Sequence, residues 1–220
     1  MYMTTIYVVR HCEAEGNNKR IFQGLTDCDI TELGKKQLNF LKKRFENIHI
    51  DRIYTSPLIC AKKTAEALNE DRNVEIVTLE NLVELNGGIL EAKPFMPTIR
   101  SIPGLAEIWN EHPEDFAPEG GEPMRDAYER IWNAISFIAK ENPGKTVAVA
   151  THGGVIRCLN CRLIYGNVNC LKNTPWSENT AVALVTVDDS GAHLEYMNDH
   201  THVPEEFLPV HSRLAEVASK

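Results

Sequence analysis

Short apolar runs alternate with longer amphipathic segments along this chain, and this alternation limits the possible folds more than any other feature. Apolar runs typical of strands lie at residues 6–9, 52–55, 74–77, 146–150, 180–187 and 193–197. Helical spacing of apolar residues occurs between them, at 33–45, 57–70, 123–142 and 155–164. Because strands joined by helices form parallel sheets with helices on both faces, the sequence predicts an α/β fold. We expect three layers, α/β/α, around a mostly parallel central sheet.

Two of the predicted helices are preceded by residues that favour a helix start. Thr31 comes before the pattern at 33–45, and threonine is a good N-cap. Ser56 and Pro57 come before the second helix, which runs to about residue 70. Serine suits the N-cap and proline suits the first helical position, so we expect this helix to begin at Pro57.

The segment at about 80–123 interrupts the alternation of strands and helices. It carries most of the prolines and has no clear period, so we expect a helical and loop cap insertion over one face of the sheet. The C-terminal tail, at about 198–220, contains three histidines without clear metal-ligand spacing, His200, His202 and His211. With 220 residues, the whole chain 1–220 is expected to form a single domain. No heptad pattern predicts an oligomeric state.

The charge balance limits the possible partners. The chain has 23 Lys and Arg against 31 Asp and Glu, a formal net charge of −8. Excess negative charge disfavours nonspecific contact with nucleic acid or anionic lipid, so we expect neither as a partner. No apolar run reaches the roughly 18 residues that a membrane span requires, and the first residues lack the features of a signal peptide. We therefore expect a cytoplasmic protein.

Six cysteines are scattered along the chain without a repeating spacing, which predicts free thiols in a protein without a secretion signal. Cys158 and Cys161 form one C-x-x-C inside the helical pattern at 155–164. Zinc sites of this kind normally need a second pair. We therefore expect both side chains to face the core or a neighbouring element, and no metal site.

Polar residues follow three of the predicted strands. Arg10 and His11 follow the first strand, Ser56 follows the second, and His152 follows the strand that ends near residue 150. In open parallel sheets the reactive site lies beyond the carboxyl ends of the strands. His152 also precedes a Gly-Gly helix start, and helix starts favour anions. The sequence therefore predicts an anion site that includes both histidines.

The residues at these strand ends belong to a longer series of motifs. In chain order the motifs are Val9-Arg10-His11-Cys12-Glu13, Asn17, Gln23-Gly24, Thr31-Glu32-Leu33-Gly34, Ser56-Pro57-Leu58, Thr64-Ala65, Leu82-Val83-Glu84, Gly88, Glu91, Gly120-Gly121-Glu122 and His152-Gly153-Gly154-Val155-Ile156-Arg157. Their order and spacing resemble the histidine phosphatase superfamily, the group that includes the cofactor-dependent phosphoglycerate mutases. The resemblance covers about residues 5–187. It is far more specific than the Arg-His pair alone.

The resemblance implies a site for phosphoryl transfer. His11 would be the nucleophile that attacks phosphorus and becomes a phosphohistidine. Arg10 would bind the phosphoryl oxygens and keep the imidazole neutral, and His152 would stabilise those oxygens in transit. Glu84 would protonate the leaving oxygen and later activate water. These roles require no metal ion and no cofactor.

The resemblance also implies a binding site for the substrate. Side-chain amides and backbone groups would surround it at four positions, Asn17, Gln23, Gly24 and Gly153, and Glu13 would orient the site. Three aromatic residues of the cap would either line a pocket or anchor the cap to the sheet, Phe95, Trp109 and Phe116. The expected partner is a small phosphorylated metabolite or another phosphomonoester, whose leaving group the sequence does not identify.

Two positions depart from the family pattern. Cys12 stands where most members have glycine, and Cys60 stands at the substrate-binding position where the pattern Ser-x-Leu-x-Arg-Ala supplies a second phosphate-binding arginine. Losing one such donor costs roughly 3 to 4 kcal/mol, or a factor of about 10² to 10³ in rate. Lys63, nearly on the same helix face, is the better candidate to replace the charge, and Cys60 is expected to be a plain small side chain.

Three functions remain open within the resemblance. A phosphatase is favoured, because a phosphoglycerate mutase-type phosphotransferase must exclude water and usually has more cap and tail. The phosphotransferase is the first alternative. The second is a catalytically weakened domain that binds phosphorylated ligands, which the loss of arginine at Cys60 favours. His11 and Glu84 argue against such a domain, because a pure binder needs neither a nucleophile nor a proton donor.

Motifs of other phosphatases have less support. Asp27-Cys28-Asp29-Ile30-Thr31 fits the D-x-D-x-T motif of haloacid dehalogenase-like phosphatases, but no buried strand directly precedes it. A cysteine phosphatase needs arginine six positions after its cysteine, and none of the six cysteines has one. No Gly-rich Walker loop is present. The histidine mechanism therefore remains the preferred interpretation.

Overall fold

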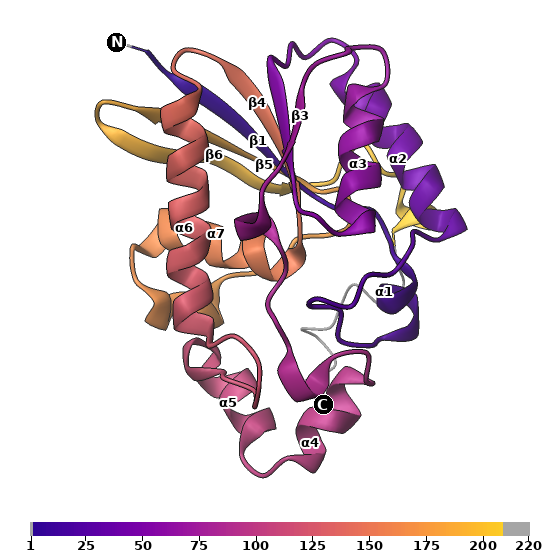
Figure 1. Cartoon of the computed structure of the whole chain (residues 1–220), viewed down its shortest axis with the longest axis vertical. Coiled ribbons are helices and arrows are strands. Elements are labelled where there is room, and N and C mark those ends of the chain that lie inside the picture. Colours follow the sequence, from indigo (N-terminus) through magenta and orange to yellow (C-terminus); the bar gives the residue numbers. More distant parts are fainter. Residues whose placement is uncertain (1, 209–220) are drawn as a thin grey trace.

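The computed structural model describes residues 2–208, which fold around a six-stranded mixed sheet (Figure 1). In spatial order the strands are β3 (Ile76–Thr78), β2 (Arg52–Thr55), β4 (Thr146–Thr151), β1 (Thr4–Arg10), β5 (Val182–Asp188) and β6 (Gly191–Asp199). The first four are parallel to one another. The last two are antiparallel to their neighbours and form one edge. The predicted α/β fold with a mostly parallel sheet is confirmed.

Helices cover both faces of this sheet. On one face lie α2 (Glu32–Phe45) and α3 (Ile59–Asn69), and on the other lie α6 (Met124–Glu141) and α7 (Gly153–Tyr165). Side chains alternate between the faces, so Val8 packs in the core on the α6 side and its neighbour Val9 in the core on the α2 side. The central strands are therefore buried on both faces, as their apolar sequences require. Among residues 2–208, no helix is long and apolar enough to cross a membrane.

Short helices gather beyond the carboxyl ends of the parallel strands (Figure 1). Most belong to the segment between β3 and α6, namely η1 (Glu80–Leu82), η2 (Gly88–Leu90), α4 (Phe95–Ser101), α5 (Leu105–Glu111) and η3 (Pro113–Asp115). The remaining ones are α1 (Glu15–Lys19), η4 (Val168–Asn173) and η5 (Glu205–Phe207). These elements surround the end of the sheet at which the site residues emerge. Of the tail, residues 209–220 with His211 lie outside the described part of the chain.

The two predicted helix starts have different outcomes. Thr31 is the N-cap of α2, and its hydroxyl accepts a hydrogen bond from the Gly34 N–H at 3.0 Å. The prediction that α3 begins at Pro57 is wrong, because the helix begins at Ile59. The Oδ1 of Asp27 accepts from the Ile59 N–H at 2.7 Å. The Ser56 hydroxyl contacts His152 and accepts from the Leu58 N–H at 3.3 Å, ahead of the first helical residue. A carboxylate from a distant loop therefore caps this helix.

Candidate active site

The carboxyl ends of β1, β2 and β4 meet at one place in the structure. Arg10 and His11 lie at the end of β1, Ser56 directly after β2, and His152 directly after β4. The imidazole rings of the two histidines are 5.1 Å apart between centroids. Both histidines are buried, with 6% and 2% of their surface exposed for His11 and His152. The sheet therefore brings together residues that are 141 positions apart in the sequence.

A backbone contact orients the ring of His11. Its Nδ1 lies 2.6 Å from the carbonyl oxygen of Cys12. Because a carbonyl only accepts hydrogen bonds, this contact assigns the proton to Nδ1 and leaves a lone pair on Nε2. Burial, and next the charge of Arg10, lower the pKa of His11 to about 3. The ring is therefore neutral near pH 7 and can act as a nucleophile through Nε2.

His152 is held by a side chain from the neighbouring strand end. Its Nε2 lies 2.7 Å from the hydroxyl oxygen of Ser56. Burial, followed by the nearby His11 and Arg10, lowers the pKa of His152 well below its ordinary value. This ring is thus neutral as well. It lies close enough to His11 to contact a group bound at Nε2 of that residue.

Arg10 places the main positive charge beside the two rings. One guanidinium nitrogen donates to the carbonyl oxygen of Ser177 at 2.5 Å, and this contact fixes the planar group. Its Nε is buried and has no hydrogen-bond partner among the described residues. A Cβ at position 153 would lie 3.3 Å from this Nε, so Gly153 lets the guanidinium approach the start of α7. The unused donor fits an anion bound at the site.

The carboxyl group of Glu84 lies at the start of α7. Its Oε2 accepts from the Gly154 N–H at 2.8 Å and its Oε1 from the Leu85 N–H at 2.9 Å. The guanidinium of Arg130 donates to the carbonyl oxygen of Val83 at 3.0 Å, which fixes the segment that carries Glu84. Burial raises the pKa of Glu84 despite the two backbone donors. A carboxyl group that keeps its proton to higher pH is suited to protonate a leaving group.

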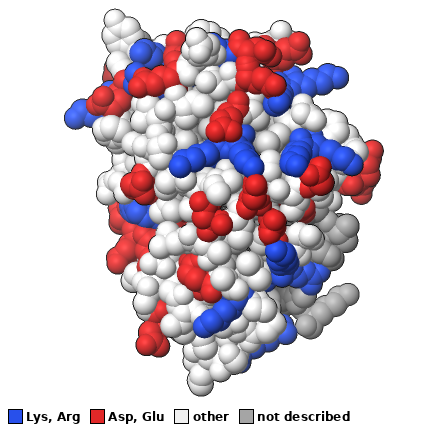
Figure 2. All heavy atoms as spheres, turned by 45° about the vertical axis from the view of Figure 1, so that its right-hand side comes forward, with Lys and Arg blue, Asp and Glu red and all other residues white. Residues whose placement is uncertain are grey.

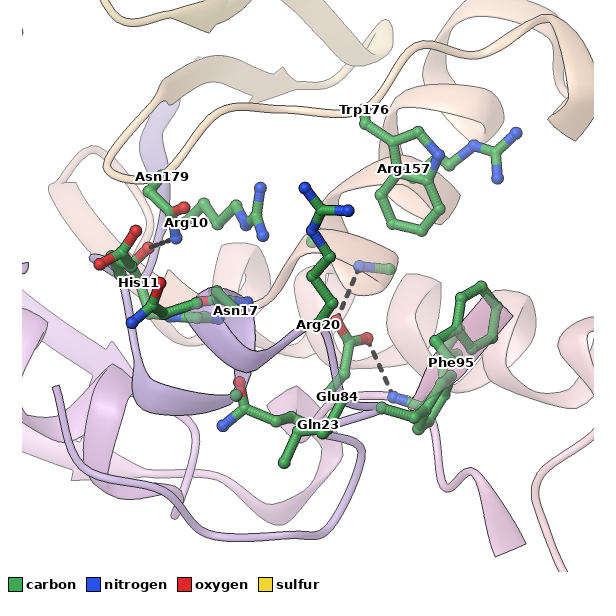
Figure 3. A pocket seen from close by; sticks show the side chains of 18 of the residues that line it. Arg10, His11, Asn17, Arg20, Gln23, Glu84, Phe95, Arg157, Trp176 and Asn179 are labelled. Atoms are coloured by element: carbon green, nitrogen blue, oxygen red, sulfur yellow. Dashed lines mark hydrogen bonds between the residues drawn. The ribbon is translucent and has the colours of Figure 1, made fainter. Parts of the chain in front are cut away.

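A pocket of about 940 Å³ opens beside these groups (Figure 3); Arg10, His11 and Glu84 line it, whereas His152 does not. It is lined by residues from β1, α1, the cap, α7 and the loop before β5, among them Arg10, His11, Asn17, Arg20, Gln23, Glu84, Phe95, Trp109, Gly153, Arg157, Trp176 and Asn179. Figure 3 shows the side chains of Arg10, Arg20 and Glu84 pointing into the same space. Both charge and apolar surface are therefore available to a ligand.

The predicted binding residues fall into two groups. Asn17, Gln23 and Gly153 line the pocket. Gly24 is not part of the lining, and its N–H donates to the carboxylate of Glu91 at 3.3 Å. Glu91 also accepts from the N–H groups of Leu25 and Thr26, so it anchors this loop. The structure therefore gives Gly24 a role in the loop and not in the wall of the pocket.

Cys60, also predicted to bind substrate, is not among the residues that line the pocket, and it is buried, with 5% of its surface exposed. One ligand atom each of His11, Cys60 and His152 can be chosen so that all three lie within 4.8 Å of one another. Lys63 does not replace the missing arginine, because its ammonium pairs with Asp29 at 2.5 Å and it does not line the pocket. Lys63 lies three residues after Cys60 on α3, and its side chain points toward the loop that contains Asp29.

The aromatic residues of the cap divide between the two roles expected for them. Phe95 and Trp109 line the pocket. Phe116 is buried in the core, and its ring lies 4.8 Å from that of Trp109 between centroids. Trp109 also contacts the ring of Trp176 at 5.9 Å, across from the cap. A line of aromatic rings thus connects the core of the cap to the wall of the pocket.

Several lining residues were not among the predicted site residues, including Arg20, Arg157, Trp176 and Asn179. The Asn179 amide donates to the carbonyl oxygen of His11 at 3.0 Å, and so supports the strand end that carries His11. The guanidinium of Arg157 lies over the ring of Trp176, 4.7 Å from its centroid. Of these four, only Arg157 belonged to a motif. The others lie in loops, where neither period nor spacing signals a role.

The aspartates of the D-x-D-x-T segment have structural partners. Asp27 caps α3, and Asp29 pairs with Lys63. The segment 27–29 has no regular secondary structure and does not follow a strand. The haloacid dehalogenase-like interpretation therefore has no support in the structure.

Comparison with known sequences gives one family. The profile described as "Histidine phosphatase superfamily (branch 1)" matches residues 6–200. A relative called "Phosphoserine phosphatase 1", from Hydrogenobacter thermophilus, is 26% identical over 215 residues, which cover 96% of this chain and 100% of the relative. "Probable phosphoglycerate mutase GpmB" from Photorhabdus laumondii is 31% identical over 71% of this chain and 73% of the relative. Similar sequences thus carry the names of both phosphatases and mutases.

Comparison with solved structures gives the same fold. Bacillus stearothermophilus YhfR superimposes with a TM-score of 0.86 and 31% sequence identity, over 91% of this chain and 100% of that protein. A phosphoserine phosphatase mutant from Entamoeba histolytica, solved in complex with phosphoserine, has a TM-score of 0.78. At 22% identity, over 91% of this chain and 100% of that one, the second match supports the fold alone.

Proposed function

The chain belongs to the histidine phosphatase superfamily, and from this we propose that it is a phosphomonoester phosphatase that acts through a phosphohistidine on His11. The observation that carries the proposal is the contact between Nδ1 of His11 and the Cys12 carbonyl at 2.6 Å. It leaves Nε2 free in a residue that lines the same pocket as Arg10 and Glu84, with the ring of His152 at 5.1 Å. These groups supply a nucleophile, a cation for the phosphoryl oxygens and a proton donor.

The proposed reaction has two displacements at phosphorus. In the first, Nε2 of His11 attacks, the bond from phosphorus to the ester oxygen breaks, and Glu84 gives its proton to the departing alcohol. Arg10 and His152 stabilise the charge on the phosphoryl oxygens during transfer. In the second, water attacks the phosphorus of the phosphohistidine, the phosphorus–nitrogen bond breaks, and the Glu84 carboxylate takes a proton from the water. Inorganic phosphate leaves, and His11 and Glu84 return to their starting states without a metal ion.

The pocket favours hydrolysis over phosphate transfer within one substrate. A volume of about 940 Å³ is more than a compact phosphorylated metabolite fills, so water has room beside the substrate. A mutase, in contrast, must keep water from the phosphohistidine. Relatives with phosphatase names include the Hydrogenobacter protein and "Uncharacterized phosphatase PhoE" from Bacillus subtilis, which is 28% identical over 80% of this chain and 90% of the relative.

A small phosphomonoester is the substrate class that the pocket fits. Arg20 lies in its wall, together with an ion pair of Lys172 and Glu111 at 2.5 Å. Because the Hydrogenobacter relative carries the name of a phosphoserine phosphatase, phosphoserine is the first substrate to test. Over the face seen in Figure 2, acidic and basic side chains are interspersed without a continuous basic area. Together with the net charge of −8, this favours a small-molecule partner over nucleic acid.

Hydrolysis in the presence of chelator tests the proposal. We expect the purified chain to hydrolyse p-nitrophenyl phosphate and phosphoserine with excess EDTA, and to form an acid-labile phosphoenzyme. His11→Ala should abolish both. The matched control is His49→Ala, which removes an exposed histidine that pairs with Asp51. Equal activity of the His11 variant would refute the mechanism, and binding of vanadate without turnover by the unmodified protein would favour the catalytically weakened domain.

A further inference from the structure

Cys60, one of the two residues that depart from the family pattern, completes a cluster of soft metal ligands. His11, Cys60 and His152 come from three separate elements and all are buried. Among residues 2–208, this is the one group of three or more His, Cys, Asp or Glu residues close enough to hold a metal ion together. Imidazole nitrogen and thiolate sulfur are the ligands that zinc prefers, and three protein ligands leave a fourth position open.

The distances are close to those of a zinc site. Zinc binds nitrogen at about 2.0 Å and sulfur at about 2.3 Å in a tetrahedron, so two nitrogen ligands lie about 3.3 Å apart and a nitrogen and a sulfur about 3.5 Å apart. The three atoms here lie within 4.8 Å of one another. Closing this gap needs side-chain shifts of about 1 Å.

We propose that Zn²⁺ binds to His11, Cys60 and His152 and thereby inhibits the enzyme. The Sγ–H proton of Cys60 is released to solvent as the sulfur–zinc bond forms, and each imidazole donates a lone pair. Water or a phosphate oxygen takes the fourth position. Because the lone pair on Nε2 of His11 then belongs to the metal, it is not available to attack phosphorus. The binding site stands on the geometry, whereas the inhibition rests on the proposed function.

The surrounding charges allow a cation at this place. Arg10 repels it, but the thiolate that forms at Cys60 as zinc displaces the thiol proton supplies a negative charge in direct contact with the metal. The Nδ1 of His11 faces the Cys12 carbonyl and the Nε2 of His152 faces the Ser56 hydroxyl, so the other nitrogen of each ring lies outside these contacts. An arginine at position 60 would add a second positive charge and remove the sulfur ligand. The cysteine therefore changes a site for anions alone into one that also accepts a soft cation.

Cobalt absorption tests the site without any activity measurement. Co²⁺ substitutes for Zn²⁺ and gives a sulfur-to-cobalt charge-transfer band only where a thiolate is a ligand. We expect one equivalent of Co²⁺ to produce this band in the full chain, and Cys60→Ser to abolish it. Cys60→Ala is a second variant in case serine disturbs folding, which thermal unfolding would show. Cys28→Ser and Cys170→Ser, at partly exposed cysteines, are the controls that should keep the band.

Zinc affinity and inhibition complete the test. Competition with a chromophoric chelator should show that Cys60→Ser binds Zn²⁺ at least about 100-fold more weakly than the unmodified chain. Zinc should inhibit hydrolysis of p-nitrophenyl phosphate reversibly, and the same variant should require correspondingly more zinc. A band that persists in both Cys60 variants, or that a control removes, overturns the site. Zinc bound through Cys60 with full activity overturns the inhibition. If the unmodified chain has no hydrolytic activity, the proposed function is refuted. The cobalt band would still show whether Cys60 is a metal ligand.

Discussion

Replacing Glu84 with glutamine separates the two steps of the proposed reaction. Glutamine keeps the length of the side chain and one carbonyl oxygen, but it has no proton to give and cannot take one from water. Its NH₂ group would also face one of the two backbone donors, Leu85 N–H or Gly154 N–H, that the carboxylate now accepts. That unsatisfied contact should lower the free energy of unfolding by about 1 to 3 kcal/mol.

The size of the kinetic effect depends on the leaving group. General acid catalysis contributes roughly 10² to 10⁴ in rate, and the alcohol of phosphoserine needs the full contribution because an alkoxide is a poor leaving group. We therefore expect kcat/KM for phosphoserine to fall by about 10³ in the Glu84→Gln variant. Nitrophenolate leaves without a proton, so the first displacement with p-nitrophenyl phosphate should slow by less than about tenfold.

Rapid mixing with p-nitrophenyl phosphate makes the prediction visible. Because the second displacement needs Glu84 as a base, the variant should release one nitrophenolate per active site in a fast burst and then turn over slowly. With phosphoserine as the substrate, the variant should show no burst of serine release, because its first displacement is also slow. In the unmodified enzyme, kcat/KM for phosphoserine should fall as the pH rises through the raised pKa of Glu84, since the protonated acid is lost. The variant should lack this decline.

Equal losses on both substrates without a burst would refute the reasoning, because they would show that Glu84 acts on binding or folding. Glu206→Gln is the matched control. Glu206 lines the same pocket, so this variant removes a carboxylate of the wall that has no role in the proposed mechanism. It should retain both the rate on phosphoserine and the decline with pH. A similar loss in the control would assign the effect to the charge of the pocket.

Three further substitutions test other parts of the site. Cys60→Arg should raise kcat/KM for phosphoserine roughly 10²-fold or more by restoring a phosphate donor, and an unchanged rate would exclude position 60 as such a contact. Gly154→Ala would place a Cβ 2.5 Å from Oε1 of Glu84, so kcat/KM should fall at least about tenfold in steady-state assays. Asp27→Ala removes the acceptor for Ile59 N–H and should lower the urea-unfolding free energy by about 1 kcal/mol; an unchanged value would contradict that capping role.

The sequence predicts the elements of this fold because each is long enough to show a period. The apolar runs and helical spacings predict the central strands and the main helices, and Thr31 predicts the start of α2. The start of α3 is different. Ser56 and Pro57 look like a helix start locally, but the hydroxyl of Ser56 contacts His152, 96 positions away. The helix then begins two residues later under Asp27, a contact that no local pattern reveals.

The same distinction applies to the pocket. Arg10, His11 and His152 can be placed together from the sequence, because the carboxyl ends of parallel strands meet at one edge. Asn179 and Trp176 reach the pocket from a loop, and only the tertiary arrangement brings them there. Lys63 was expected near the phosphate from helical spacing alone. Spacing gives the approximate direction of a side chain, but it does not reveal an acidic partner such as Asp29 on a distant loop.

Cys60 links the weakened anion site to the proposed cation site. Compared with a site that has arginine at position 60, this site has one positive charge fewer beside the two neutral imidazoles. It should therefore attract a phosphate dianion less strongly and repel a soft cation less strongly. One substitution should therefore change both properties in opposite directions. Cys60→Arg should speed hydrolysis and abolish zinc inhibition together. Faster hydrolysis with zinc inhibition retained would mean that the metal binds without the sulfur, and the link between the two properties would be broken.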